Sequence, residues 1–221
     1  MTKQLVFLHT SPVHIATFDR LLGELAPEIP VQHRVDESLL QEARATGITA
    51  QLAQRVTDRV VDALGADGAV MLCTCSTIGG CAEAVSQGTE RTVLRVDRAM
   101  AEKAVALGSH IVVVAALAST LAPTRQLLME VAAAMDKPVQ IDELLCADAW
   151  AKFERGDQAG YLHAIAACLR DYAAKGDVIV LAQASMADAA KLCTDLPVPI
   201  LSSPRLGLEA AIEAYRRSSM E

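Results

Sequence analysis

Aromatic residues are scarce in this 221-residue sequence: they make up 3% of it and include a single Trp. Proteins that stack nucleic-acid bases depend on aromatic side chains, so this scarcity argues against such a surface. Blocks of basic residues are also missing, and 20 Lys and Arg against 27 Asp and Glu give a net charge of −7. Because phosphate contacts need clustered cations, we expect no nucleic-acid partner.

Long apolar runs are missing too. The sequence has no stretch of 18 apolar residues, so we expect no membrane-spanning helix and no membrane partner. The short apolar run near the N-terminus does not match a secretory signal, which predicts a cytoplasmic location. The six cysteines are then expected to be reduced thiols. The motifs GxGxxG, GxxxxGKS/T and HExxH are also absent, so nothing here indicates a nucleotide cofactor or a zinc protease.

Short runs rich in Val, Ile and Leu alternate with longer Ala-, Leu- and Glu-rich segments of helical spacing. The short runs are continuously apolar, which is typical of parallel strands covered on both faces. This alternation predicts an α/β fold with parallel sheets. The predicted strands are Leu5–Leu8, Val31–Val35, Ala69–Leu72, Thr92–Val96, Ile111–Ala115, Pro138–Ile141, Val178–Leu181 and Val198–Leu201. The predicted helices include Thr49–Leu64, Arg98–Leu107, Leu121–Met135, Ala159–Lys175 and Arg205–Arg217.

The eight predicted strands divide into two similar sets of four. Val70-Met71-Leu72 is echoed by Val178-Ile179-Val180, 108 residues later, and the strand around Val6 is echoed around Val114 at the same offset. We therefore predict two pseudosymmetric α/β halves, each with a four-stranded parallel sheet flanked by helices.

Small residues, most of them polar, follow several of the predicted strands. Ligands of open parallel sheets bind beyond the carboxyl ends of the strands, where helix N-termini offer free N–H groups. Two similar halves facing each other would bring these positions to one cleft, whose donors and positive helix ends favour a carboxylate. The alternative is that each Ser or Thr is an ordinary helix N-cap. The residues concerned are Thr10, Ser11, Cys75, Ser76, Thr77, Ser119, Thr120 and Ser185.

Cys75 lies between the predicted strand Ala69–Leu72 and the helical segment Ile78–Val85. At a helix N-terminus the dipole and the unpaired N–H groups favour a thiolate, which can act as a base or a nucleophile. A buried structural cysteine is the alternative. The spacing Cys73-x-Cys75-x5-Cys81 also resembles a metal or redox site. No second Cys pair and no nearby His supports that interpretation, so no metal site is predicted.

Five segments are similar to one known family: AVMLCTCSTIGG (Ala69–Gly80), VLRVDRAMAEKAV (Val93–Val105), ASTLAPT (Ala118–Thr124), DVIVLAQASM (Asp177–Met186) and VPILSSPRLG (Val198–Gly207). Together they resemble the aspartate/glutamate racemase superfamily, which includes glutamate, aspartate and hydantoin racemases, maleate isomerase and arylmalonate decarboxylase. The resemblance implies two pseudosymmetric α/β domains, an active site at their interface and no cofactor. By the family's pattern, the first domain is 1–97 plus 205–221 and the second is 98–204.

The resemblance also implies which residues act. In the racemases one Cys from each domain flanks the substrate α-carbon; one removes the proton and the other returns it from the opposite face. The first maps onto Cys75, whereas the second falls at Gln183, which is followed by Ala184 and Ser185. A carboxamide has no useful proton to give or take near neutral pH, so Gln183 cannot be the second acid/base. Homo-oligomers are common in the family, but no apolar stripe in this sequence specifies one.

One thiol and one amide restrict the chemistry. Removing a proton beside a carboxylate places negative charge on oxygen, which preorganised donors must stabilise. Backbone N–H groups after the first, third, fifth and seventh strands and the Gln183 NH2 group are the candidate donors. We predict a cofactor-independent isomerase-type enzyme for a small carboxylate-bearing substrate, with Cys75 and Gln183 as catalytic residues. The substrate-binding residues would be Thr10, Ser11, Ser76, Thr77, Ser119, Thr120, Ala184 and Ser185. A decarboxylase or lyase of the same superfamily and a non-catalytic binding protein for a small acid are the alternatives.

Overall fold

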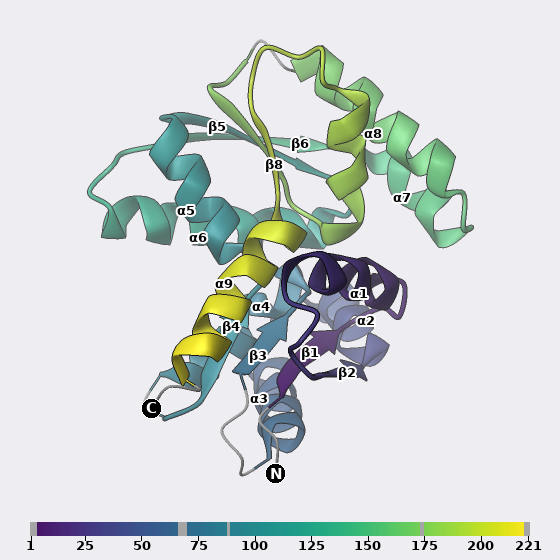
Figure 1. Ribbon diagram of the computed structural model, residues 1–221. Coiled ribbons are helices and arrows are strands. Elements are labelled where there is room, and N and C mark those ends of the chain that lie inside the picture. Colours follow the sequence, from purple (N-terminus) through teal and green to yellow (C-terminus); the bar gives the residue numbers. More distant parts are fainter. Residues whose placement is uncertain (1–3, 66–69, 88, 173–174, 219–221) are drawn as a thin grey trace. The chain divides into compact units, whose positions relative to one another are not determined.

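The computed structural model describes residues 4–65, 70–87, 89–172 and 175–218. The chain divides into two compact units, Met1–Val96 with Pro204–Glu221 and Asp97–Ser203 (Figure 1). Each unit contains one four-stranded sheet in which all paired strands run parallel. The predicted α/β fold with two four-stranded parallel sheets is confirmed.

The first unit has the strand order β2-β1-β3-β4. Its strands are β1 (Leu5–His9), β2 (Val31–Val35), β3 (Val70–Cys73) and β4 (Thr92–Arg95). Its helices are α1 (His14–Leu25), α2 (Glu37–Thr46), α3 (Ala50–Leu64), α4 (Ser76–Glu83), the 3-10 turn η1 (Ala84–Ser86) and α9 (Ser203–Ser218), whose first residue lies in the second unit.

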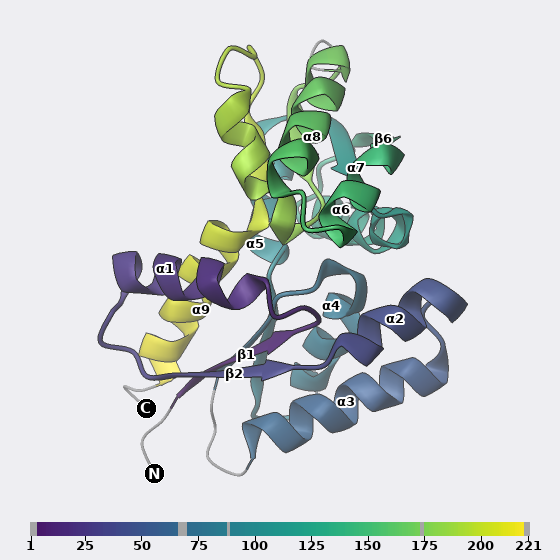
Figure 2. The same cartoon turned by 90° about the vertical axis from the view of Figure 1, so that its right-hand side faces the viewer.

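Helices cover both faces of this sheet. Successive strand residues point to opposite faces, so Leu5 and Phe7 pack with α1 and α9, whereas Val6 and Leu8 pack with α2 and α3. Figure 2 shows α1 and α9 on one side of β1 and β2 and α3 on the other. Burying each such apolar side chain contributes roughly 1.5–3 kcal/mol, which explains why β1 is apolar from Leu5 to Leu8 and β3 along its whole length.

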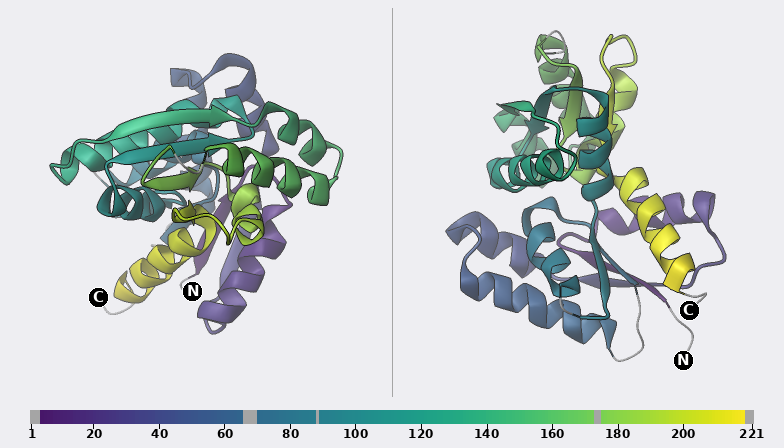
Figure 3. Two further views of the ribbon diagram at one scale, coloured as in Figure 1. Left: turned by 90° about the horizontal axis from the view of Figure 1, so that it is seen from above. Right: turned by 90° about the vertical axis from the view of Figure 1, so that its left-hand side faces the viewer.

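The second unit repeats this arrangement with the strand order β6-β5-β7-β8. Its strands are β5 (His110–Ala115), β6 (Gln140–Leu145), β7 (Val178–Leu181) and β8 (Ile200–Ser202). Its helices are α5 (Arg98–Leu107), η2 (Ala118–Thr120), α6 (Leu121–Ala134), α7 (Ala147–Glu154), α8 (Gln158–Tyr172) and η3 (Ala184–Leu192). The paired strands β5 and β6 run side by side in the left view of Figure 3.

The edge strands differ most from the sequence prediction. All eight were expected to be buried runs, but β2 and β6 are edge strands whose residues are exposed or half-buried. Strand β6 begins at Gln140 and continues through Asp142 to Leu145, because an edge strand tolerates polar side chains facing water. Strand β8 begins only after Pro199, which has no N–H to donate to the sheet.

Two predicted segments extend outside the described residues. The strand predicted to begin at Ala69 is β3, which is described from Val70. The helix predicted over Ala159–Lys175 is α8, which ends at Tyr172, and residues 173–174 are not described. Helix α4 begins at Ser76, two residues before the predicted start, so Cys75 is its N-cap residue.

Candidate active site

The carboxyl edge of the first sheet brings together the candidate residues of that unit. Thr10 and Ser11 follow β1, and Cys75 follows β3, which is paired with β1. The backbone N–H of Thr74 donates to the carbonyl of Leu8 at 3.0 Å, so the chain segments leaving β1 and β3 start side by side. Thr10 is buried, and Ser11 is half-buried.

Cys75 sits at the N-terminus of α4. Its side chain makes no capping hydrogen bond, and 9% of the residue is exposed. Ser76 and Thr77 form the first turn of α4 and are both buried. The hydroxyl of Ser76 has no hydrogen-bond partner among the described residues. A helix N-terminus leaves its first N–H groups without intrahelical partners, so this corner presents donors beside the thiol.

A buried arginine lies against the same helix. Arg95, the last residue of β4, directs its Nη2 at the carbonyl of Ser76 at 3.4 Å. A Cβ at Gly79 would lie 3.0 Å from the Cβ of Arg95, and one at Gly80 would lie 3.3 Å from its Nη1. The two glycines therefore let the guanidinium approach α4 closely, and this places a positive charge beside its first turns.

The carboxyl edge of the second sheet is organised around Gln183. This residue follows β7 and precedes η3, and its Oε1 accepts hydrogen bonds from the backbone N–H groups of Ala116 at 2.7 Å and Leu117 at 3.0 Å. Two N–H donors require an oxygen, so they decide which way the amide is turned. The Nε2 group has no partner among the described residues and is a free donor.

This arrangement corrects one sequence expectation. The backbone N–H groups just after β5 were candidates for holding a charged substrate oxygen. Those of Ala116 and Leu117 are instead engaged by Gln183 of the same unit. Gln183 thus occupies two backbone N–H donors and offers its own Nε2 group as a donor in their place.

The other predicted residues of this unit occupy different environments. The hydroxyl of Ser119, in η2, is buried without a partner in the described part of the chain. Thr120 is buried at the N-terminus of α6, and Ala184 is the buried first residue of η3. The hydroxyl of Ser185 is already bound to that of Tyr161 at 2.8 Å. Ser185 is therefore less available to a ligand than Ser119.

Sequence reasoning missed two polar residues near these edges. Thr124, in the first turn of α6, is fully buried, and its Oγ1 has no partner among the described residues. Thr74, directly before Cys75, hydrogen-bonds His9 at 2.8 Å. The segment ASTLAPT includes Thr124, so the sequence held a signal for it. Nothing local marked the pairing of Thr74 with His9, which lies 65 residues away.

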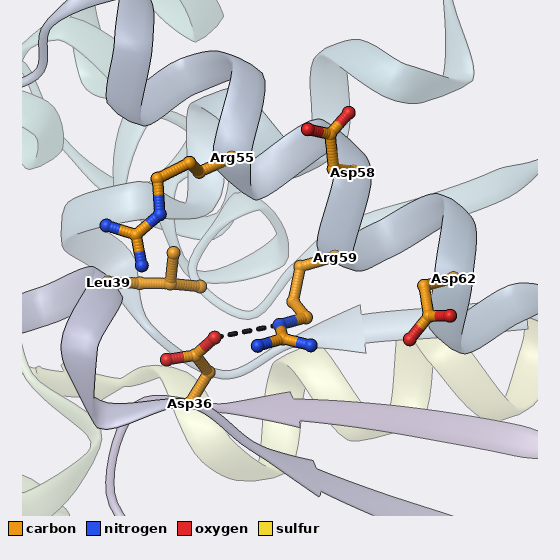
Figure 4. A pocket seen from close by; sticks show the side chains of 6 residues that line it. All are labelled: Asp36, Leu39, Arg55, Asp58, Arg59 and Asp62. Atoms are coloured by element: carbon orange, nitrogen blue, oxygen red, sulfur yellow. Dashed lines mark hydrogen bonds and ion pairs between the residues drawn. The ribbon is translucent and has the colours of Figure 1, made fainter.

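A polar pocket of about 290 Å³ opens elsewhere on the first unit (Figure 4). Two of its lining residues, Asp36 and Arg59, form an ion pair at 2.8 Å, and Arg55 is paired with Glu42 outside the lining. None of the predicted site residues lines it. The lining residues are Asp36, Leu39, Arg55, Asp58, Arg59 and Asp62.

Within residues 4–65, 70–87, 89–172 and 175–218, no cluster of three or more His, Cys, Asp or Glu side chains is arranged to hold a metal ion. Over the same ranges no helix has the length and apolar character that a membrane crossing requires.

Several solved proteins share the fold of this chain. No family model matches the sequence, and no curated protein matches it. Glutamate racemase from Francisella tularensis, solved with D-glutamate, has a TM-score of 0.72 at 14% identity, covering 98% of this chain and 82% of that one. Aspartate racemase from Picrophilus torridus has a TM-score of 0.69 at 11% identity, covering 97% and 95%. The chain has the racemase fold.

Another enzyme with this fold catalyses a different reaction. Arylmalonate decarboxylase has a TM-score of 0.60 at 15% identity, covering 95% of this chain and 91% of its own. One fold therefore supports both racemisation and decarboxylation, so the reaction must be argued from the site residues.

Proposed function

We propose that this chain is a cofactor-independent, isomerase-type enzyme of the Asp/Glu racemase superfamily. It acts at the carbon next to the carboxyl or carbonyl group of a small acid. One observation carries the proposal: Cys75 and Gln183 occupy equivalent places in two equivalent sheets. Each residue follows the third strand of its unit, β3 or β7, which lies in the sheet between the first and the fourth strand of that unit. Each residue also precedes a helix. One of the two positions holds a thiol and the other an amide.

Cys75 is the proposed proton-transferring or nucleophilic group. Its sulfur lies at the start of α4, where the unpaired N–H groups of the first turn favour an anion. As a base, the thiolate takes the proton from the substrate carbon, and the electron pair moves onto the carboxyl oxygens. As a nucleophile, it adds to an activated double bond, allows rotation and leaves again. In the first route the thiol then returns its proton, or one exchanged with solvent, to the carbon as the electron pair moves back from oxygen. In the second route the C–S bond breaks as the double bond re-forms, so both routes restore the thiolate.

Gln183 is the proposed donor to the oxygen that gains charge. Its Oε1 is fixed by two N–H groups, so its Nε2 is held in one orientation without movement at the moment of reaction. A preorganised donor of this kind contributes roughly 3–4 kcal/mol to a transition state that carries negative oxygen. The amide cannot exchange protons with carbon, which favours a reaction that needs a single thiol.

We further propose that polar residues at the carboxyl edges of the sheets bind a small carboxylate. The proposed binding residues are Thr10, Ser11, Ser76 and Thr77 from the first unit and Ser119, Thr120, Ala184 and Ser185 from the second. The racemase solved with D-glutamate supports a carboxylate-bearing substrate. The unpartnered hydroxyls of Ser76 and Ser119 support it as well, because buried hydroxyls normally have partners.

The test is proton exchange in deuterium oxide. Small acids are incubated with the enzyme, and NMR follows deuterium incorporation at the carbon next to the carboxyl group. We expect incorporation or geometric isomerisation with wild type and with the control Cys168→Ser, and none with Cys75→Ser. Full turnover by Cys75→Ser would remove the thiol from the mechanism. Loss of carbon dioxide would move the assignment to a decarboxylase, and binding without turnover would indicate a binding protein.

A further inference from the structure

Four side chains of the first unit form a continuous hydrogen-bonded chain outside the residues assigned above. Asp19 Oδ1, on α1, lies 2.9 Å from His33 Nε2, on β2. His33 Nδ1 lies 2.9 Å from Nε2 of His9, the last residue of β1. His9 Nδ1 lies 2.8 Å from Thr74 Oγ1. The chain thus runs from an exposed carboxylate to the residue before Cys75.

Aromatic packing fixes the geometry of the two imidazoles. Their rings are within 13° of parallel, and Phe7 stacks on His33 with ring centroids 5.0 Å apart. Phe18 packs against His9 at 5.8 Å, and His9 is fully buried. The Asp19 side chain, by contrast, is 52% exposed. Stacking and hydrogen bonds hold both rings in place, so the switch described below needs only protons to move.

The positions of the protons follow from donor and acceptor chemistry when both histidines are neutral. The Asp19 carboxylate only accepts, so His33 carries its proton on Nε2 and accepts at Nδ1. His9 then donates from Nε2 and accepts at Nδ1. The Thr74 hydroxyl must therefore donate to His9, and it cannot also donate to the carbonyl of Leu8, which lies 3.2 Å away.

One added proton satisfies every contact at once. A doubly protonated His33 donates from Nε2 to Asp19 and from Nδ1 to His9 Nε2. His9, still neutral, now carries its proton on Nδ1 and donates to Thr74 Oγ1. The Thr74 hydroxyl is released to donate to the Leu8 carbonyl at 3.2 Å. Every hydrogen bond after Asp19 has reversed its direction, and no heavy atom has moved.

We propose that Asp19, His33, His9 and Thr74 form a proton-linked switch that positions the corner carrying Cys75. A proton held on the histidine pair turns the Thr74 hydroxyl from His9 to Leu8. The backbone N–H of Thr74 already donates to that same carbonyl at 3.0 Å. In the protonated state two hydrogen bonds therefore link Thr74 to β1. Cys75 is the next residue, so the switch acts through its backbone, and the four residues are positioning residues.

The surrounding charges decide where the proton stays. Burial, followed by the charges of His33 and His14, lowers the pKa of His9 to about 3. His33 instead faces the Asp19 carboxylate. Among the described residues, the charged or titratable groups that act on the pair are thus Asp19 and His14 from α1 and the histidines themselves. The carboxylate beside His33 and the full burial of His9 favour an added positive charge on His33 rather than on His9.

The experiment is nitrogen-15 NMR of the histidine rings across a pH titration of the full chain. We expect both histidines to carry Nε2–H at high pH. At low pH we expect doubly protonated His33 together with His9 in the neutral Nδ1–H form. A His9 that keeps Nε2–H throughout, or that becomes charged together with His33, would overturn the switch.

Variants separate the switch from a structural role. Asp19→Asn removes the facing charge and should move the tautomer change of His9 to lower pH. Thr74→Val keeps the shape but removes the acceptor for Nδ1–H, and should suppress that change. The matched control is Asp142→Asn, which alters the exposed His110–Asp142 pair of the second unit. An equal shift in the control would contradict the assignment.

A second readout connects the switch to the thiol. The rate of Cys75 alkylation by iodoacetamide is followed against pH in wild type and in Asp19→Asn. We expect a step in this profile that moves together with the His9 tautomer change. If the NMR transition moves and the alkylation profile does not, the link to Cys75 is wrong. Neither measurement requires turnover, so both outcomes are independent of the proposed function.

Discussion

The side-chain oxygen of Gln183 lies 2.7 Å from the backbone nitrogen of Ala116, although the two residues are 67 positions apart. This bond joins the segment after β7 to the segment after β5. The same oxygen accepts a second hydrogen bond from the backbone N–H of Leu117. Gln183 therefore has two roles that can be separated by mutation. Its oxygen accepts from the unit's own backbone, and its nitrogen, which has no partner among the described residues, is the donor we propose for a substrate.

Substitution of Gln183 should separate stability from activity. Gln183→Met leaves two N–H groups without an acceptor, one of them on buried Ala116, and should lower the free energy of unfolding by about 1–3 kcal/mol. Gln183→Glu keeps an acceptor for both N–H groups and should retain more of that stability, but it loses the proposed donor and turnover. Denaturant unfolding and a turnover assay measure the two effects. Equal stability of the Met variant would show that the bonds are dispensable.

The six thiols should differ in their rate of alkylation near neutral pH. Burial raises the pKa of Cys81, Cys146 and Cys193, which lowers their thiolate fraction. Cys75 is buried, with 9% of the residue exposed, but it precedes the first turn of α4, where N–H groups have no intrahelical partner and favour a thiolate. It should therefore be labelled first, as mass spectrometry of iodoacetamide-treated protein can show. Cys168→Ser should keep the fast site, and Cys75→Ser should lose it. Preferential labelling of another cysteine would contradict an ionisable thiol at position 75.

Gly207 on α9 should not tolerate a side chain. A Cβ there would lie 2.3 Å from the carbonyl oxygen of Val96, which is backbone and cannot turn away. Gly207→Ala should therefore destabilise the first unit by about 1–3 kcal/mol. Gly23→Ala is the control, because α1 has open space at that position; it should stabilise by about 0.5–1 kcal/mol. Thermal unfolding of both variants tests the contrast, and similar midpoints would contradict it.

Acid should weaken the start of β5 through Asp177. Its carboxylate accepts from the backbone N–H groups of His110 and Ser109, each at 2.9 Å. The bond from His110 first, and then that from Ser109, lowers the pKa of Asp177 below its ordinary value of 3.8. A carboxyl group whose pKa is lower in the folded than in the unfolded state stabilises the folded protein at pH values above its unfolded-state pKa. This contribution is lost as the pH falls through the folded-state pKa.

The measurement is the unfolding free energy of wild type and Asp177→Asn from about pH 6 to about pH 2. The variant should be less stable near neutral pH, and the difference should shrink as the pH falls. Parallel curves over the whole range would show that the carboxylate charge makes no contribution.

Local sequence patterns were sufficient to predict the central strands and the helices that follow them. Strands such as β3 and β7 are apolar at every position because both faces of the sheet are covered, and this leaves a continuous signal in the sequence. The corner at Cys75 was also predictable, since a strand, a short polar turn and a helix follow one another within a few residues. Edge strand β6 was only partly predicted, because its position at the sheet edge allows Asp142 and Glu143 to face water.

The sequence by itself determined the α/β class, the two sets of four strands and the position of the thiol at a strand end, since each depends on neighbours along the chain. The tertiary structure alone decided that Gln183 engages the N–H groups after β5, and that His9 connects Thr74 to His33 and Asp19. Hydrogen bonds are short and directional, so a contact between residues far apart exists only after packing has brought their strands and helices together.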